Sequence, residues 1–132
     1  WSAICKGQQH DAAHLILTAG VWSASFLKPF GVHLPLEAER GYHLVFRNPG
    51  ININNSVMDV EHMCVASQMA GGVRVAGTAE FAGIKAAPDY RRAFVFKKAV
   101  KSLFPRINID EVVPWMGRRP TFPDSLPCIG RV

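Results

Sequence analysis

Hydrophobic and polar residues alternate most clearly in the stretch LPLEAERGYHLVF, residues 34–46. Its larger side chains fall on two opposite faces of a strand: Tyr42, Leu44 and Phe46 on one, His43 and Val45 on the other. Gly41, in the middle, leaves room for another group to approach the backbone closely. The pattern predicts a strand that ends at Phe46 and divides these side chains between its two faces.

The next segment predicts a loop followed by antiparallel strands. Residues 48–55, NPGININN, have the Asn, Pro and Gly content of a loop. Further on, Gly71-Gly72 separates two runs of strand-forming residues, Met63–Met69 and Val73–Phe81. We therefore expect two or three strands over residues 57–81, joined as an antiparallel meander.

A single long helix is predicted after these strands. Pro88 and Asp89 suit a first helical turn, and Pro105 ends the helix, which gives about four and a half turns at roughly 3.6 residues per turn. Apolar residues gather on one side of this helix, and the basic residues of 91–101 gather on the other. We expect the apolar side to pack on the sheet.

The two ends of the chain are less regular. The apolar run 13–18, AHLILT, predicts a buried strand, and VWSASFLKPFG a short helix with Ser23 as N-cap and a stop at Pro29 and Gly31. Residues 108–117 predict a last strand that ends before two arginines. The expected fold is therefore α+β, an antiparallel (mixed) β-sheet covered by a long helix.

Composition limits the class of protein. The chain has 132 residues, 48% hydrophobic and 19% charged, as in one globular domain, and no apolar run approaches the roughly 18 residues of a membrane span. It begins at Trp1 without the features of a signal peptide, so we expect it to be part of a longer protein. Three cysteines without a Cys-x-x-Cys pair favour a reducing compartment, the cytoplasm, with a peripheral place on the inner face of a membrane as the alternative.

The charge leaves a binding module open as an alternative function. A net charge of +5 and a pI near 9.5 would attract polyanions at low salt. A free-standing basic α+β module for anions or nucleic acid rests on this charge and on the basic side of residues 91–101, without any recognised nucleic-acid-binding motif. We expect no specific nucleic-acid partner. We also expect no metal site, because His62 and Cys64 have no second pair at a metal-binding spacing.

Three motifs resemble one enzyme family. They are Ala19-Gly20-Val21-Trp22-Ser23, Gly41-Tyr42-His43, and the closing segment from Gly117 to Gly130, GRRPTFPDSLPCIG. Together they resemble the FAD-dependent amino-acid oxidoreductases, the group of D-amino acid dehydrogenases, glycine oxidase and sarcosine oxidase, and most of all the D-amino acid dehydrogenase small-subunit type. The Gly-x-Gly-x-x-Gly fingerprint for the FAD pyrophosphate does not occur in this sequence.

The resemblance implies a division of the chain and an activity. Residues 1–30 would be a remnant of the FAD-binding domain, 31–117 the substrate-binding domain, and 118–132 the return to the FAD-binding domain. The parent enzyme would use FAD to oxidise D-amino acids, or glycine- or sarcosine-like amines, to 2-oxo acids and ammonia, passing electrons to a quinone or to oxygen. The flavin carries out the hydride step, so the resemblance names no catalytic acid or base, and this chain alone is expected to be inactive.

The resemblance also assigns residues. Arg119, before Pro120, would hold the substrate carboxylate with its planar guanidinium, while Arg118 occupies a variable position; the alternative for Arg119 is a surface ion pair. Tyr42 would line the substrate pocket, with core packing as its alternative. Gly20, Trp22 and Gly130 would lie near the cofactor, with ordinary structural roles as the alternative for Gly20 and Trp22.

Overall fold

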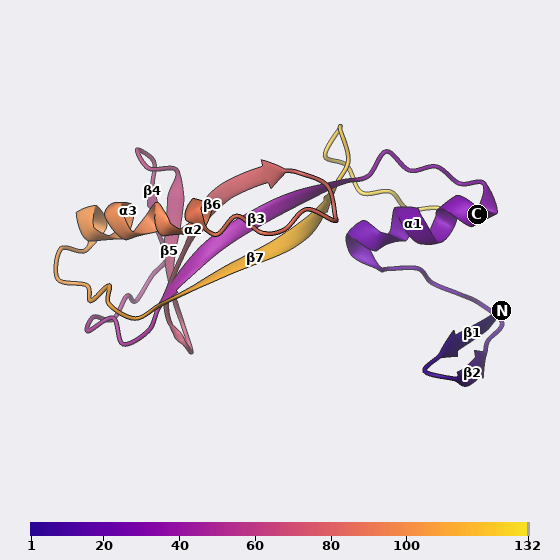
Figure 1. Ribbon diagram of the computed structural model, residues 1–132, viewed down its shortest axis with the longest axis horizontal. Helices are drawn as coiled ribbons and strands as arrows, with labels where there is room; N and C mark the ends of the chain where they lie inside the picture. Colours follow the sequence, from indigo (N-terminus) through magenta and orange to yellow (C-terminus); the bar gives the residue numbers. More distant parts are fainter. Residues whose placement is uncertain (132) are drawn as a thin grey trace.

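The computed structural model describes residues 1–131, and the larger of the two sheets in this part of the chain is antiparallel and five-stranded (Figure 1). The strand order is β4-β5-β6-β3-β7. The strands are β3 (Glu37–Phe46), β4 (Val57–Asp59), β5 (Cys64–Met69), β6 (Gly72–Phe81) and β7 (Val112–Thr121). The predicted meander is confirmed, because β4, β5 and β6 pair antiparallel in sequence order. The turn between β5 and β6 is Ala70-Gly71, one residue earlier than predicted, since Gly72 already pairs with Met69.

The predicted faces of β3 are confirmed. Tyr42, Leu44 and Phe46 are at most 1% exposed on one side of the sheet, while His43 and Val45 are half-buried on the other. β3 lies between β6 and β7 and pairs with both. The ladder between β3 and β6 shifts by one residue between Tyr42 and His43, where Gly77 of β6 has no partner, so that β6 carries a bulge there.

The single long helix was a wrong prediction. Two short helices, α2 (Arg91–Phe94) and α3 (Phe96–Leu103), occupy that stretch. Val95 between them has a ψ of −28°, which is closer to a 3-10 turn than to an α-helix, so the helical ladder is interrupted there. Pro88 and Asp89 lie before α2 outside any helix, and Tyr90 is the N-cap residue of α2.

The layer arrangement nevertheless follows the expectation. Apolar residues of both helices are buried against the sheet: Ala93, Phe96, Ala99 and Val100. α3 contacts β5 and β6, and α2 contacts β3, β6 and β7 (Figure 1). The helices therefore cover one face of the sheet, and the opposite face, called the open face below, keeps Val65, Val113 and Trp115 exposed.

The first thirty residues form small separate elements. A hairpin of β1 (Ser2–Cys5) and β2 (Gln8–Asp11) was not predicted; its turn places Lys6 and Gly7 at positive φ. The buried strand expected over 13–18 was a wrong prediction. Leu15 and Ile16 are 56% and 84% exposed, and none of the described strands pairs with this segment, so its backbone has no ladder to join.

The short helix is confirmed, with a different start. It consists of η1 (Gly20–Trp22), α1 (Ser23–Leu27) and η2 (Lys28–Phe30). Trp22, not Ser23, is the N-cap residue of α1, and no side chain caps it. Gly31 ends the segment with a φ of +79°, a left-handed conformation that suits glycine.

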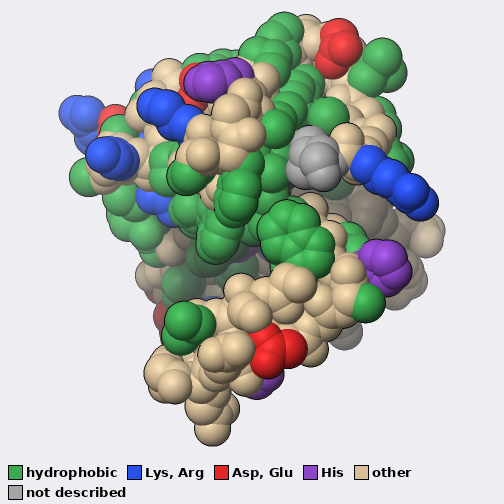
Figure 2. Space-filling model, turned by 90° about the vertical axis from the view of Figure 1, so that its right-hand side faces the viewer, with side chains coloured by type: hydrophobic (Ala, Val, Ile, Leu, Met, Phe, Trp, Pro, Cys, Tyr) green, Lys and Arg blue, Asp and Glu red, His purple; other side chains and the backbone are tan. Residues whose placement is uncertain are grey.

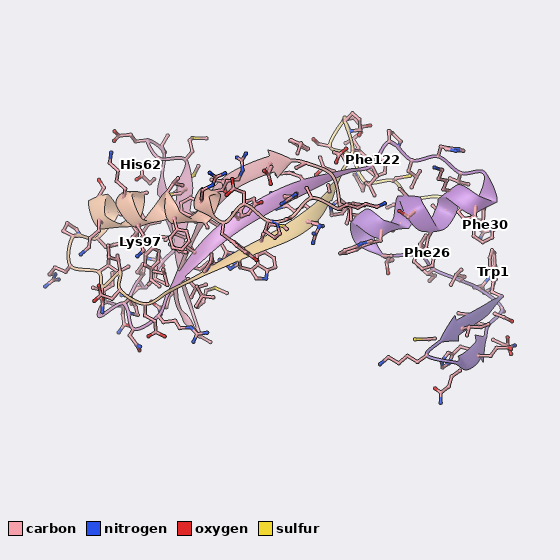
Figure 3. All side chains as sticks on the ribbon, viewed as in Figure 1. Trp1, Phe26, Phe30, His62, Lys97 and Phe122 are labelled. Carbon is pink, nitrogen blue, oxygen red and sulfur yellow. The ribbon has the colours of Figure 1, made fainter. Side chains whose placement is uncertain are left out.

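Exposed hydrophobic side chains gather at the end of the molecule that carries α1 and both chain ends (Figures 1 and 2). They include Ile4, Ile16, Phe26, Leu126 and Ile129. Trp1 and Phe30 point toward each other there, with ring centroids 6.4 Å apart in an edge-to-face arrangement (Figure 3). Among the described residues, no helix is long and apolar enough to cross a membrane.

Candidate functional site

The two arginines lie inside the last strand and on opposite faces of the sheet. The predicted strand ended before them, but β7 runs from Val112 to Thr121 and passes through both. Arg118 pairs in register with Arg40, and Arg119 with Glu39. Since neighbouring strand residues point to opposite faces, Arg118 lies on the helix-covered face and Arg119 on the open face.

Arg118 is hydrogen-bonded to the loop that follows β6. Its Nε donates a hydrogen bond to the carbonyl oxygen of Ile84 at 3.0 Å. The side chain is half-buried. Arg118 therefore ties the loop to β7 on the face away from Arg119.

Arg119 offers an exposed guanidinium on the open face. Its Nη1 donates to Glu39 Oε1 at 2.6 Å, and the side chain is 57% exposed. The hydroxyl of Thr121 donates to the other oxygen of the Glu39 carboxylate at 3.0 Å. Within residues 1–131, Nη1 is the one nitrogen of this guanidinium with a hydrogen-bond partner. The N–H groups of Nη2 and Nε are therefore available to an incoming carboxylate.

A pair of glycines directly opposite each other forms the floor of this site. Gly41 of β3 and Gly117 of β7 are in register. A Cβ atom on Gly41 would overlap the guanidinium of Arg119, and a Cβ on Gly117 would overlap the six-membered ring of Trp115. Opposite residues of antiparallel strands have Cα atoms about 4.5–5.5 Å apart, so guanidinium and indole lie next to each other above the glycine pair.

Trp115 is held on its other side by a histidine. The His43 and Trp115 rings stack, with centroids 4.7 Å apart and planes 19° from parallel. Burial, and secondarily the charge of Arg74, lowers the pKa of His43, so the ring is neutral at physiological pH. Trp115 is still 52% exposed, which leaves an indole surface open to solvent beside Arg119.

Tyr42 lies on the opposite face of the sheet from Arg119, so the structure does not bring these two predicted residues together. It is 1% exposed. Its hydroxyl donates to Glu80 Oε2 at 2.7 Å, and accepts from Arg40 Nη2 at 2.9 Å and from the backbone N–H of Asp89 at 3.1 Å. The polar end of Tyr42 is fully engaged within the protein.

Arg40 is the centre of this buried network. It is fully buried, and it donates to the carbonyl oxygens of Ala86 and Ala87 at 3.1 and 2.7 Å. Its Nε lies 3.1 Å from Glu80 Oε2, close enough for an ion pair but without the alignment of a hydrogen bond. The hydrogen bond from Tyr42, and then the charges of Arg40 and Arg92, lower the pKa of Glu80. The network fixes the loop before α2 to the sheet.

The residues expected near the cofactor lie outside the sheet. Gly20 has a φ of +56° with no atom near the position of a Cβ, and Trp22 is 50% exposed. Their element, η1, contacts β7, the strand of Arg119. Gly130 is exposed, also with open space above its Cα. Open backbone and an exposed ring next to β7 fit contact with one part of an FAD molecule, while the fingerprint for its pyrophosphate is not in this sequence.

Glu39 and Trp115 were not predicted as site residues. Each lies two positions before one of the paired glycines, and so on the same strand face as that glycine. That spacing is visible in the sequence. The pairing of Gly41 with Gly117 is not visible there, and it is this pairing that brings Glu39 and Trp115 to the same site.

Comparison with known proteins places the chain in a family. A D-amino-acid oxidase of Bradyrhizobium diazoefficiens is 40% identical over 124 residues, which are 91% of this chain and 29% of that protein. A D-amino acid dehydrogenase of Paramagnetospirillum magneticum is 35% identical over 123 residues, 90% of this chain and 29% of that protein. The chain thus spans about 29% of the length of these relatives.

The fold has a counterpart among solved structures. The crystal structure of glycine oxidase from Geobacillus kaustophilus superposes with a TM-score of 0.73 at 17% identity, covering 96% of this chain and 35% of that one. The family model described as DAO, FAD dependent oxidoreductase, matches residues 2–132. With nearly every residue inside that match, the chain belongs to the DAO family of FAD-dependent oxidoreductases.

Proposed function

We propose that this chain is the substrate-binding part of an enzyme that oxidatively deaminates D-amino acids, or glycine- or sarcosine-like amines, to 2-oxo acids and ammonia, or the corresponding amine where the substrate nitrogen is methylated. The names of the two relatives, a D-amino-acid oxidase and a D-amino acid dehydrogenase, support an amino-acid substrate. Family membership favours this function over the basic anion- or nucleic-acid-binding module. Oxygen and a quinone both remain candidate electron acceptors.

The observation that carries the proposal is the exposed guanidinium of Arg119 above Gly41. Glu39 engages one nitrogen, Nη1, and none of the described residues accepts a hydrogen bond from the other donors of this half-exposed side chain. A guanidinium held in this way can bind a substrate carboxylate through two parallel hydrogen bonds, which fixes the orientation of the amino acid as well as its position. We assign Tyr42 to the support of the fold, because its hydroxyl has three partners and its ring is buried.

The cofactor would lie between this sheet and the part of the protein beyond this chain. FAD, when bound, would supply the two-electron acceptor for oxidation of the amino acid at its α-carbon, and water would release the 2-oxo acid and ammonia. Gly20, Trp22 and Gly130 would contact it, in keeping with the division into residues 1–30, 31–117 and 118–132. Residue 132 lies outside the described residues. The exposed hydrophobic end of the molecule would pack against the rest of the FAD-binding domain.

The test is a substitution of Arg119 in the full-length, FAD-loaded enzyme. Arg119→Leu should lower kcat/KM for D-amino acids about 100-fold or more, because it leaves the carboxylate without a charged partner. Arg119→Lys should recover only part of this loss, since an ammonium restores the charge but not the planar fork. FAD content, measured by absorbance, should stay constant.

Arg118→Leu is the matched control. The same change of residue type on the other face of β7 removes a hydrogen bond to Ile84 and no group of the open face. It should lower kcat/KM far less than Arg119→Leu. A larger effect at Arg118 would move the carboxylate site to the helix-covered face, and no effect at either position would place it elsewhere in the enzyme.

A further inference from the structure

We propose that Trp115 is the specificity-determining residue for the substrate side chain, and that its indole favours D-amino acids with aromatic or other large apolar side chains. The inference rests on the proposed function, since it takes Arg119 as the carboxylate anchor. It goes further by naming the surface beside that anchor and the class of side chain that the surface prefers.

The geometry places the indole next to the carboxylate anchor. The Arg119 guanidinium lies over Gly41 and the Trp115 ring over Gly117, and these two glycines are opposite each other in the ladder. An amino acid whose carboxylate is held by Arg119 therefore has its α-carbon above or near the glycine pair. A substrate side chain that leaves this α-carbon toward β7 along the open face reaches the indole of Trp115.

The indole is a fixed and accessible surface. His43 stacks on Trp115 and the absence of a side chain on Gly117 lets the ring lie close to the backbone, so its position is restrained from two sides. Half of the residue is nevertheless exposed. A flat apolar surface of this kind binds aromatic and large apolar groups most strongly, because they bury the largest apolar area against it. The indole offers nothing to an acidic side chain, because the electron-rich face of an aromatic ring repels anions.

Binding of two carboxylic acids to the full-length, FAD-loaded enzyme tests this inference. Phenylacetate carries both a carboxylate and a phenyl ring, and propanoate has only a short alkyl group; their Kd values can be followed by changes in flavin absorbance. In Trp115→Leu the ratio of the Kd of phenylacetate to that of propanoate should rise about tenfold, and in Trp115→Phe much less. With substrates, kcat/KM for D-phenylalanine should fall relative to D-alanine in the same order.

Two further variants separate the possible failures. Gly117→Ala pushes the indole out of place without altering it, and should raise the same Kd ratio if Trp115→Leu does not fold. Arg119→Leu should weaken both acids together. If it does so while the Trp115 and Gly117 variants leave the ratio unchanged, the role of Trp115 is overturned and the proposed function stands. If Arg119→Leu changes neither Kd, the proposed function itself fails.

Discussion

Glu39 and Arg119 face each other directly across β3 and β7, with Oε1 of the carboxylate 2.6 Å from Nη1 of the guanidinium. The pair lies on the open face, and Thr121 holds the second oxygen of Glu39. Exposed ion pairs of this kind contribute little to stability, about 0.2–1 kcal/mol. The contact matters more for where it keeps the guanidinium than for the stability of the fold.

Removal of Glu39 should loosen the carboxylate anchor. In Glu39→Ala, Arg119 loses the partner that restrains it, and ordering a long side chain on substrate binding costs about 0.5–1.5 kcal/mol. We expect KM for D-amino acids to rise about 2- to 10-fold in steady-state kinetics of the full-length enzyme. Glu39→Gln keeps an oxygen that can accept from Nη1, and should stay closer to the native KM. Equal effects of both variants would show that the charge, not the position, is what matters.

Gly41 should be required for the place of Arg119. Gly41→Ala puts a methyl group where the guanidinium lies, and the end of that flexible side chain must move. A displacement of about 1 Å in a positioning group can cost up to about 100-fold in rate, so we expect kcat/KM to fall about 10- to 100-fold. The melting temperature should hardly change.

Gly71→Ala is the control for that substitution. No atom lies within 4 Å of the position of its Cβ, so it tests the effect of the methyl group alone. It should change kcat/KM by less than about twofold, as surface substitutions do. A native kcat/KM in Gly41→Ala would mean that Arg119 binds substrate from another position.

Tyr42→Phe should affect stability rather than substrate binding. The change keeps the buried ring and removes the hydroxyl that Glu80, Arg40 and the Asp89 N–H share. Leaving buried polar groups without a partner costs about 1–3 kcal/mol, which urea denaturation of the native and variant proteins would measure. The Kd of propanoate should stay the same. A weakened Kd with unchanged stability would instead place Tyr42 in the substrate pocket.

Glu80 should make the fold sensitive to acid. Tyr42, Arg40 and Arg92 lower the pKa of this carboxyl in the folded state, so the unfolded chain takes up its proton at a higher pH. The stabilisation is complete above the ordinary pKa of glutamate, about 4.3, and is lost as the pH falls through the lower folded value. Free energies of unfolding measured from pH 6 to pH 3 should therefore fall less steeply in Glu80→Gln than in the native protein. A steeper fall in the variant would contradict the sign of this linkage.

The sequence by itself determined those elements for which the local pattern of residues is compatible with a single secondary structure. Alternation predicted which residues of β3 share a face, since a strand places every second side chain on the same face. Gly41 indicated a close approach, which the Arg119 guanidinium makes. Gly71-Gly72 marked the hairpin between β5 and β6. The three motifs taken together, of which the segment from Gly117 to Gly130 is the longest, indicated the family.

Where a segment depends on its neighbours, the sequence was a poor guide. Residues 13–18 are apolar enough for a buried strand, yet none of the described strands lies beside them, and Ile16 is 84% exposed. The helix after β6 has the periodicity of one long element, but the backbone at Val95 tightens where the chain passes from β3 and β7 to β5 and β6. Neither the exposure of residues 13–18 nor the interruption at Val95 follows from the helix or strand propensities of the residues themselves.

Only the tertiary structure decided how the site is assembled. That Arg119 and Tyr42 lie on opposite faces, and that Glu39, Gly41 and Trp115 join Arg119, follows from the register between β3 and β7. A shift of one residue in that register would exchange the faces of every side chain of β7, bringing Arg118 to the open side. The register is set by burial of the whole sheet against α2 and α3, which is a property of the packed molecule and not of either strand alone.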